Sequence, residues 1–459
     1  MLTTALIIAL AAGPKAPPGA DVITYAPKVD GVTQLLPFFQ AAGTRSLIFK
    51  PDTWAADAHP LINVNLLDKD ALARSGIDGS AALSRSQLGD VVVGCVTVKD
   101  LEAYRAACDA KLARMGEVFH KTENGVTLHA SRDPLGRVLV AYAIAGRESC
   151  AIAGHGRSID SQLPALMKLV NKPTTNPAIS MATKVPGALQ FIISTGTRHA
   201  VVALNAKELT LTADAKLKNL RLNELGGAGE SPLARFAPAG MTVLRARFKK
   251  DDMPNIVEQL VRTFPGATAL LPVAKKVAPH LTGNTAAVAS HAKVTTGLRT
   301  KEARFFALKS AMVAEVDDVA AVQAELNALD GKSLATREGT VSVSLSGRFL
   351  IVANDGETKA KAEAALANAA GKQAHGVEFV VDPRLVARGL QQVPLLEAVQ
   401  SQELAGLVAA GSELGPLLLA SKQLYGWLDS TGAQQHTARL TWELDAAAFA
   451  APTTDGGVR

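Results

Sequence analysis

The 459-residue sequence predicts an α+β fold made of two related units, each a mainly antiparallel sheet with helices packed on one face. Many short segments alternate apolar and polar residues, as ELTLTADAKL does at residues 208–217. A period of two is typical of an antiparallel sheet with one solvated face. Residues 99–115 place apolar side chains at helical spacing instead. In addition, roughly 200 residues of the N-terminal half recur in diverged form in the C-terminal half.

The recurrence is an ordered series of matching segments. DVITYAP at residue 21 corresponds to MTVLRARF at residue 241, and CVTVKDLEAYRAACDA at residue 95 corresponds to VAEVDDVAAVQAELNA at residue 313. ENGVTLHA at residue 123 then matches REGTVSVS, CAIAGHGRSID matches LIVANDGETKA, and GALQFII matches GVEFVV. Ser194-Thr195-Gly196 pairs with Ser430-Thr431-Gly432 at the end. Two copies of this length predict a pair of domains and not a solenoid.

The expected strands of the first copy share the alternation or are short apolar runs. They are residues 21–26, 61–67, 80–85, 90–98, 126–131, 138–145, 149–153, 188–194, 198–204 and 207–217. The helix at 99–115 carries an apolar face made of Leu101, Tyr104, Cys108, Leu112 and Met115, and its counterpart carries Val319, Val322, Leu326 and Leu329. Asn354-Asp355-Gly356-Glu357 predicts a capped start for a later helix that ends before Gly371.

Composition shifts give the expected boundaries. Residues 16–222 and 237–447 are the two α+β units, joined by a linker at 223–236 where glycine, serine and proline concentrate. Residues 448–459 are expected to be a flexible tail. The second unit also contains a segment, 383–428, that has no equivalent in the first unit and reads as a helical insert.

The N-terminal residues 1–15 read as a signal peptide. An apolar run precedes Ala9-Leu10-Ala11, a small-x-small cleavage site, but no Lys or Arg precedes the run. No Cys follows it, so a lipoprotein anchor is not expected. We therefore expect a periplasmic or secreted protein; the alternative is a cytoplasmic protein in which this run is a first strand or core helix.

Composition limits the class of partner. Aromatic residues make up only 4% of the sequence, so the core is expected to be aliphatic. The net charge is +6 and the Lys and Arg residues are scattered, so a nucleic-acid partner is not expected. The N-terminal apolar run is too short to cross a membrane, and no transmembrane segment is expected.

The three cysteines are predicted to be buried and inert. In the matched segments Cys95 corresponds to Val313, Cys108 to Leu326, and Cys150 to Leu350 or Ile351, so each position is aliphatic in the other copy. A disulfide between Cys95 and Cys150 on neighbouring strands stays open as the alternative.

No catalytic, cofactor or metal site is expected. The nine histidines show none of the spacings that direct two imidazoles at one ion. His120 and His129 flank a turn and are expected to be exposed. Ser194 and His199 are close in sequence, as are two residues across a hairpin turn, and no G-x-S-x-G motif accompanies them. His436 follows the second Ser-Thr-Gly turn as His199 follows the first.

The order of elements resembles families of uncharacterised bacterial exported proteins built from two diverged α+β units. The residues that carry the likeness are Pro18-Gly19 and Pro238-Ala239-Gly240 before a first strand, Val96-Thr97-Val98-Lys99-Asp100 at a strand-to-helix step, and Asn124-Gly125-Val126 in a hairpin. The resemblance implies a location in the cell envelope and offers no catalytic residues.

These expectations predict a non-enzymatic, exported envelope protein that binds another envelope protein or a hydrophobic ligand. The apolar residues of the insert are the candidate contact surface; they are Leu404, Leu407, Val408, Leu417, Leu418 and Trp427. The bland alternative is that these side chains pack on the protein's own sheet. The alternative function is an exported hydrolase or transferase whose site forms between the two units.

Overall fold

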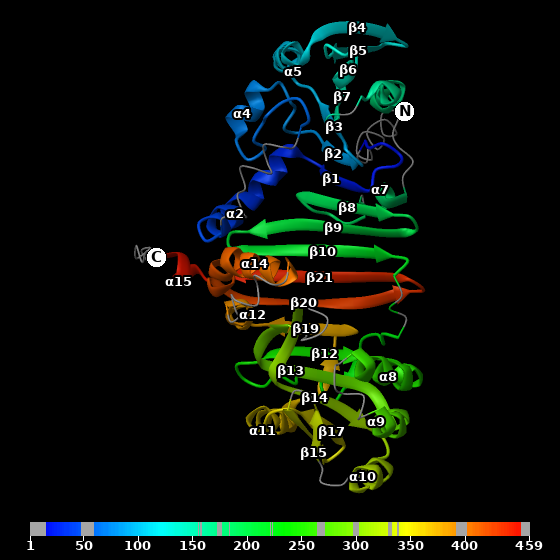
Figure 1. Cartoon of the computed structure of the whole chain (residues 1–459), viewed down its shortest axis with the longest axis vertical. Helices are drawn as coiled ribbons and strands as arrows, with labels where there is room; N and C mark the ends of the chain where they lie inside the picture. The colour runs from blue at the N-terminus through cyan, green and yellow to red at the C-terminus, as the bar shows by residue number, and fades with distance from the viewer. Residues whose placement is uncertain are drawn as a thin grey trace, which may run out of the picture. The chain divides into compact units, whose positions relative to one another are not determined.

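The structure is a computed structural model, which describes residues 15–46, 59–154, 156, 158–171, 177–182, 184–220, 222, 224–263, 271–296, 303–328, 333–336, 339–391 and 402–450. It divides into two compact units, Met1–Leu220 and Arg221–Arg459, whose helices and strands are labelled in Figure 1. The predicted signal peptide falls almost wholly outside the described residues, as does most of the predicted tail. No described helix is long and apolar enough to cross a membrane.

Ten strands of the first unit's described residues form one antiparallel sheet. They are β1 (Val22–Ala26), β2 (Leu83–Leu88), β3 (Val91–Thr97), β4 (Glu117–Glu123), β5 (Val126–Arg132), β6 (Val138–Ala145), β7 (Glu148–Gly154), β8 (Leu189–Thr195), β9 (Arg198–Lys207) and β10 (Thr210–Lys218). Their order in the sheet is β10-β9-β8-β1-β2-β3-β7-β6-β5-β4. The helices are η1 (Val29–Leu35), α2 (Leu36–Gly43), α4 (Lys69–Arg74), α5 (Leu101–Met115), η2 (Asp160–Gln162), α6 (Leu163–Asn171) and α7 (Pro177–Ala182).

The described strands of the second unit are also antiparallel; nine of them pair in one continuous series, and two more form a small separate sheet. The large sheet contains β12 (Thr242–Arg247), β13 (Leu281–Thr296), β14 (Ala303–Val316), β15 (Ser333–Thr336), β16 (Gly339–Ser346), β17 (Phe349–Ala353), β19 (Val377–Val381), β20 (Ser421–Gly432) and β21 (Gln435–Leu444). Their order is β21-β20-β19-β12-β13-β14-β17-β16-β15, while β11 (Gly229–Ser231) pairs with β18 (Gly371–Gln373). The helices are η3 (Lys250–Asp252), α8 (Met253–Thr263), α9 (Leu271–Val277), η5 (Ala278–His280), α10 (Val319–Asn327), α11 (Gly356–Ala365), η6 (Leu366–Asn368), α12 (Pro383–Gln391), α14 (Gln402–Leu419) and α15 (Ala446–Ala450).

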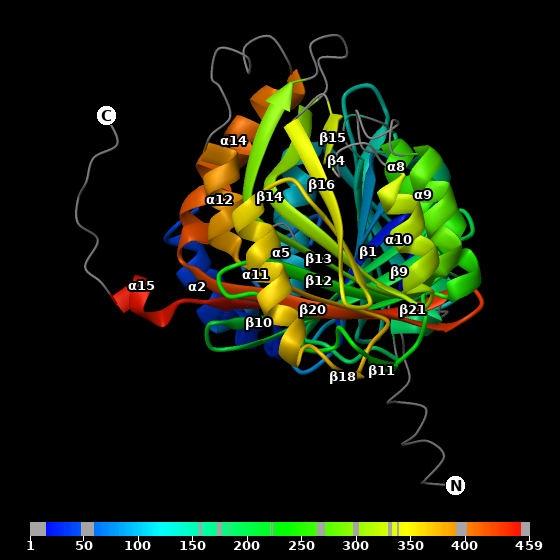
Figure 2. The same ribbon diagram turned by 90° about the horizontal axis from the view of Figure 1, so that it is seen from below.

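The α+β class is confirmed, but helices cover both faces of each sheet and not one. In the first unit α6 packs on the face that carries Cys150 and Ile152, whereas Tyr104 of α5 contacts Tyr142 on the opposite face. In the second unit α11 lies on one side of the sheet and α8, α9 and α10 lie on the other, as Figure 2 shows. The reason is that central strands such as β6, VLVAYAIA, are apolar at every position and therefore have two faces to bury.

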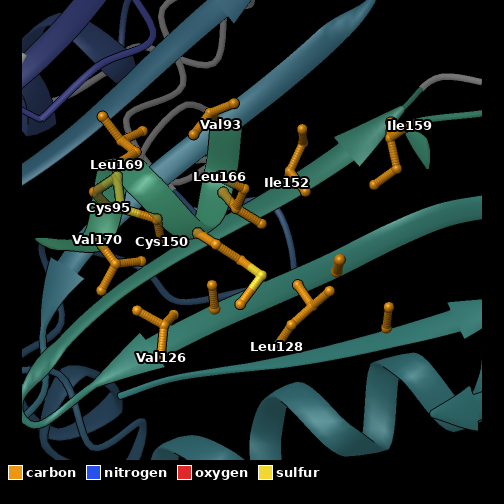
Figure 3. Close-up of a cluster of buried hydrophobic side chains, with 14 of the residues drawn as sticks. Val93, Cys95, Val126, Leu128, Cys150, Ile152, Ile159, Leu166, Leu169 and Val170 are labelled. Carbon is orange, nitrogen blue, oxygen red and sulfur yellow. A yellow bond between two sulfur atoms is a disulfide. The ribbon is translucent and has the colours of Figure 1, made fainter. Parts of the chain in front are cut away.

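The cysteines differ from the leading prediction. Cys95 of β3 and Cys150 of β7 face each other in register and form a disulfide within a buried apolar cluster (Figure 3). The expected inert thiol is correct for Cys108 alone, which is free and buried in α5. Burial there raises the pKa of the Cys108 thiol, because the thiolate would be desolvated.

Two expected elements are wrong. Residues 61–67 form an irregular segment with a turn at 66–67 and no strand, because His59 Nδ1 and Asn65 Oδ1 accept the backbone N–H groups of nearby residues that a ladder would use. The helical part of the insert ends at Leu419, and the remainder, with Trp427, belongs to strand β20. The strand β4, which pairs with β5, was not predicted, because EVFHKTE carries too few apolar residues to show a clear period.

The two sheets have the same strand order and register over nine positions. Cys95 faces Cys150 where Val313 faces Ile351, and Tyr104 and Cys108 of α5 are buried as Val322 and Leu326 of α10 are. In two of the sequence matches, nevertheless, the matched segments form strands that occupy different positions in the two sheets. The GTVSVS part of REGTVSVS lies in β16, which occupies the place of β6 and not of β5, and the two Ser-Thr-Gly turns end β8 and β20. The duplication itself stays a prediction.

Candidate functional site

One row of directly opposed residues crosses the first unit's sheet, with all side chains on one face. From β10 to β4 it consists of Ala215, Val202, Phe191, Thr24, Arg85, Gly94, Ala151, Tyr142, His129 and His120. We call this the first row. Its last three members, Tyr142, His129 and His120, are contributed by β6, β5 and β4 and form an aromatic ladder.

In the aromatic ladder each ring contacts the next one, and all three rings carry polar atoms. The rings of His129 and Tyr142 stack at 4.4 Å, and His120 meets His129 edge-on at 4.4 Å. Tyr142 donates a 2.8 Å hydrogen bond to Asp109 of α5, whose carboxylate lies 3.6 Å from His129 Nδ1. Burial lowers the pKa of His129, with Arg105 and His120 contributing and Asp109 opposing. The prediction that both histidines are exposed is therefore wrong for His129, which is 8% exposed.

A series of hydrogen bonds through His59, Tyr104 and Ser149 adjoins the aromatic ladder, since Tyr104 contacts Tyr142. His59 Nδ1 accepts the backbone N–H groups of Leu61 and Ile62, so the ring proton is on Nε2, which lies 3.1 Å from the Tyr104 hydroxyl. Tyr104 then bonds Ser149 at 2.9 Å, and Ser149 donates to the Ala143 carbonyl. Burial lowers the pKa of His59 to about 3, because protonation would put an unpaired charge in the core.

The equivalent row in the second unit contains no polar side chain. It consists of Leu440, Gly426, Phe379, Leu244, Ala287, Met312, Val352 and Val343. We call this the second row. One end is covered, since Val343 and Val352 pack in the cluster of α8, α9 and α10. Leu244 and Met312 are 42% and 41% exposed, on either side of the small residue Ala287.

The residues beside the second row are also uncharged. Opposed positions on the same face are Thr242, Ala289 and Ser310 on one side and Val377, Ala246, Thr285 and Ala314 on the other. Arg245 of β12 and Glu378 of β19 face the opposite way and pair there at 3.0 Å. The exposed part of the second row is therefore flanked on β12, β13 and β14 by uncharged residues only, of which Thr242, Thr285 and Ser310 carry hydroxyl groups.

Trp427 lies in a polar setting on the sheet's other face. Its ring stacks on His375 at 4.1 Å, and His375 Nδ1 lies 2.6 Å from Asp429. Asp429 also accepts the Gly376 N–H at 2.7 Å. At the matching position of the first unit, Asn205 accepts the Ala188 N–H and donates to the Pro186 carbonyl. Both side chains thus close the loop before a strand, which is a structural role.

The structure does not bring the sequence-predicted contact residues together. Leu417 is buried against the protein's own core, Leu418 is half-buried, and Trp427 is in a strand. The side chains of Leu404, Leu407 and Val408 lie outside the described part, although their backbone belongs to α14. Sequence reasoning missed Leu244 and Met312. A signal existed, since DVITYAP has Thr24 where MTVLRARF has Leu244.

The candidate nucleophile and base do meet. Ser194 Oγ lies 3.0 Å from His199 Nδ1 across the β8–β9 hairpin. His436, in contrast, is fully buried in β21, and its strand occupies the place of β10 and not of β9. Among the described residues no three His, Cys, Asp or Glu side chains group as a metal site would require.

Comparison with known proteins gives little. No protein-family model matches the chain, and no curated protein matches it. Solved structures of TP0453 are similar to parts of it: crystal form IV at 17% identity and a TM-score of 0.27, covering 46% of this chain and 83% of that one. Crystal form I has 14% identity and a TM-score of 0.22, covering 78% and 99%.

Proposed function

We propose that this chain is an exported, non-enzymatic protein of the cell envelope, periplasmic or secreted, that acts by binding an apolar partner. The observation that carries the binding function is the part of the second row in which Leu244 and Met312 are exposed and Phe379 and Ala287 are half-buried. We call these four residues the exposed patch. Large apolar side chains that share an uncharged surface mark contact sites more often than isolated ones do.

The disulfide supports export. Disulfides persist in oxidising compartments and are rare in the reducing cytosol. Cys95 and Cys150 are 4% and 1% exposed, so a reductant reaches their bridge only after local opening. A second unit that fills the same positions with Val313 and Ile351 needs no such bridge.

The test of binding is cross-linking with mass spectrometry in the native organism. We expect one or more specific adducts with the natural protein and their loss in Leu244→Asp/Met312→Asp. Leu135→Asp is the matched control, because Leu135 is a 76% exposed apolar residue in a turn outside either row. If the adducts persist in the double variant, the exposed patch is not the surface that binds the partner.

A further inference from the structure

The disulfide of the first unit skips a cysteine. The chain contains three cysteines, Cys95, Cys108 and Cys150, and the bridge joins the first of them to the third across 55 residues. Cys108, which lies between them in sequence, is the free thiol. All three belong to the first unit, and the second unit contains no cysteine. The choice of thiol partner therefore affects the folding of the first unit alone.

In the unfolded chain the native pair is not the favoured one. Cys95 and Cys108 are 13 residues apart, against 55 residues for Cys95 and Cys150. Because the entropy lost on loop closure grows with the logarithm of loop length, the shorter loop closes roughly ninefold more readily. A chain that is exported from its N-terminus also brings Cys95 and Cys108 into the new compartment before Cys150. Oxidation is therefore expected to join Cys95 to Cys108 first.

The folded unit excludes this pair. Cys95, like Cys150, belongs to the buried cluster that α6 covers (Figure 3). Cys108 lies one turn after Tyr104 in α5, which packs on the opposite face of the sheet. The sheet thus separates the sulfur atoms of Cys95 and Cys108, and a bridge between them would keep α5 from its place. A chain oxidised at these two residues must exchange the bridge before the first unit can fold.

The exchange has to precede folding, because burial stops it afterwards. In the folded unit Cys108 is fully buried, and burial raises the pKa of its thiol, so almost no thiolate is left to react. Cys95 and Cys150 are buried as well. Only the unfolded or partly folded chain therefore offers its sulfur atoms to a catalyst.

We propose that the first unit is a substrate of a thiol–disulfide isomerase, which converts a Cys95–Cys108 bridge into the native Cys95–Cys150 bridge. A protein disulfide of the compartment first takes two electrons from the thiols of Cys95 and Cys108 and is reduced to two thiols as they join. The isomerase thiolate then attacks the Cys95 sulfur and releases Cys108 as a thiolate, which is protonated. Finally the Cys150 thiolate attacks the same sulfur and displaces the isomerase thiolate, with no net oxidation or reduction. This rests on the proposed export, since only an oxidising compartment supplies the disulfide donor.

The test follows the bridges of the full-length protein in two stages. The reduced chain is oxidised in urea with glutathione disulfide, freed of oxidant, and diluted from urea with or without a catalytic amount of reduced protein disulfide isomerase. Free thiols are blocked with N-ethylmaleimide at intervals, and the bridges are mapped by mass spectrometry of peptides. We expect Cys95–Cys108 to exceed Cys95–Cys150 roughly ninefold in urea. After dilution, the native bridge should form over minutes to hours alone and at least about tenfold faster with the isomerase.

Cys108→Leu, which copies Leu326 of the second unit, is the matched control. Without the middle thiol, Cys95 and Cys150 can pair only with each other, so the variant should carry the native bridge already in urea. The isomerase should then leave its rate of refolding unchanged. Cys108→Ala gives the same readout if the longer leucine side chain disturbs the packing of α5.

Any of three results would contradict the isomerase step. They are a native bridge that predominates in urea, a refolding rate of the natural chain that the isomerase does not raise, and a Cys108→Ala chain that depends on the isomerase as strongly as the natural one. Alkylation of the protein in its native organism separates these results from a failure of export. Reduced Cys95 and Cys150 would contradict export itself, whereas a bridged pair together with one of the three results removes the isomerase step alone.

Discussion

The two units place different chemistry on the same scaffold. Their rows cross the same strands in the same register, yet the first holds Thr24, Arg85, Tyr142 and His129, and the second holds only apolar side chains. Behind the rows, Tyr104 and Ser149 are hydrogen-bonded in the first unit, where Val322 and Leu350 pack in the second. The sheet thus accepts either solution. Among the described residues Tyr104, Tyr142 and Ser149 are hydrogen-bonded, whereas the buried ring nitrogens of His129 accept and donate no hydrogen bond.

The largest expected difference between the units is their stability at low pH, which should fall in the first unit and not in the second. The pKa of His59 is about 3 in the folded protein and near 6.5 in the unfolded chain, so between these values the unfolded state binds the extra proton. Stability is full above pH 6.5 and falls as the pH drops towards 3, by up to about 4 kcal/mol. His129, whose pKa burial also lowers, adds in the same direction.

Hydrogen exchange with mass spectrometry at pH 7 and pH 4 checks this. Peptides from α5 and β7 should lose protection at pH 4 more than those from α10 and β17. Equal loss in both units would contradict the assignment of the acid sensitivity to His59.

The next effect concerns Gly426, which takes the place of Val202 in the row. A Cβ at Gly426 would overlap the Arg439 carbonyl oxygen and lie 2.8 Å from Phe379 Cζ, because Phe379 lies over this glycine. We expect Gly426→Val to cost about 3 kcal/mol, by overpacking. The matched exchange Val202→Gly should cost about 1 kcal/mol, and a denaturant titration of both variants measures the difference.

The disulfide gives a third comparison. Cys95→Ser/Cys150→Ser loses the covalent link and buries two hydroxyl groups, whereas Cys95→Val/Cys150→Ile copies the second unit. We expect the serine pair to be about 2 kcal/mol less stable than the aliphatic pair, as measured by urea unfolding. If the serine and the aliphatic double variants are equally stable, valine and isoleucine do not pack at these positions as Val313 and Ile351 do in the second unit.

The smallest expected effect is at Asp429. Asp429→Asn keeps the acceptor for the Gly376 N–H, as Asn205 does in the first unit, and should change stability by less than about 0.5 kcal/mol. Asp429→Ala removes it and should cost about 1 kcal/mol. Thermal unfolding of both variants tests this. A large loss in the asparagine variant would assign importance to the charge beside His375.

Much of the fold could be predicted because it follows local pattern. The alternation of β10, the apolar face of α5 and the cap at Asp355 are each set by residues close in sequence. The residues at the positions equivalent to Cys95 and Cys108 in the second unit, Val313 and Leu326, were also predicted correctly. Strand β4 was not predicted, and β16 was matched to β5 when its equivalent in the first unit is β6. The reason is that sheet order depends on contacts between segments far apart in sequence.

The candidate site was harder to predict than the fold. Leu244 and Met312 are 68 residues apart, and neither is unusual in its own strand. Only the register of β12, β13 and β14 brings them to one face. The helical insert attracted attention because it is locally apolar, but its Leu417 is apolar for the ordinary reason that it is buried.

The Cys95–Cys150 bridge also sets how the chain responds to force. The 55-residue separation between the cysteines spans α5 and the strands β4, β5 and β6, and all of this chain lies inside a closed loop. A pull on the two termini would be carried across the bridge and would leave the loop slack. At about 3.4 Å per residue, reduction should lengthen the fully stretched molecule by roughly 190 Å.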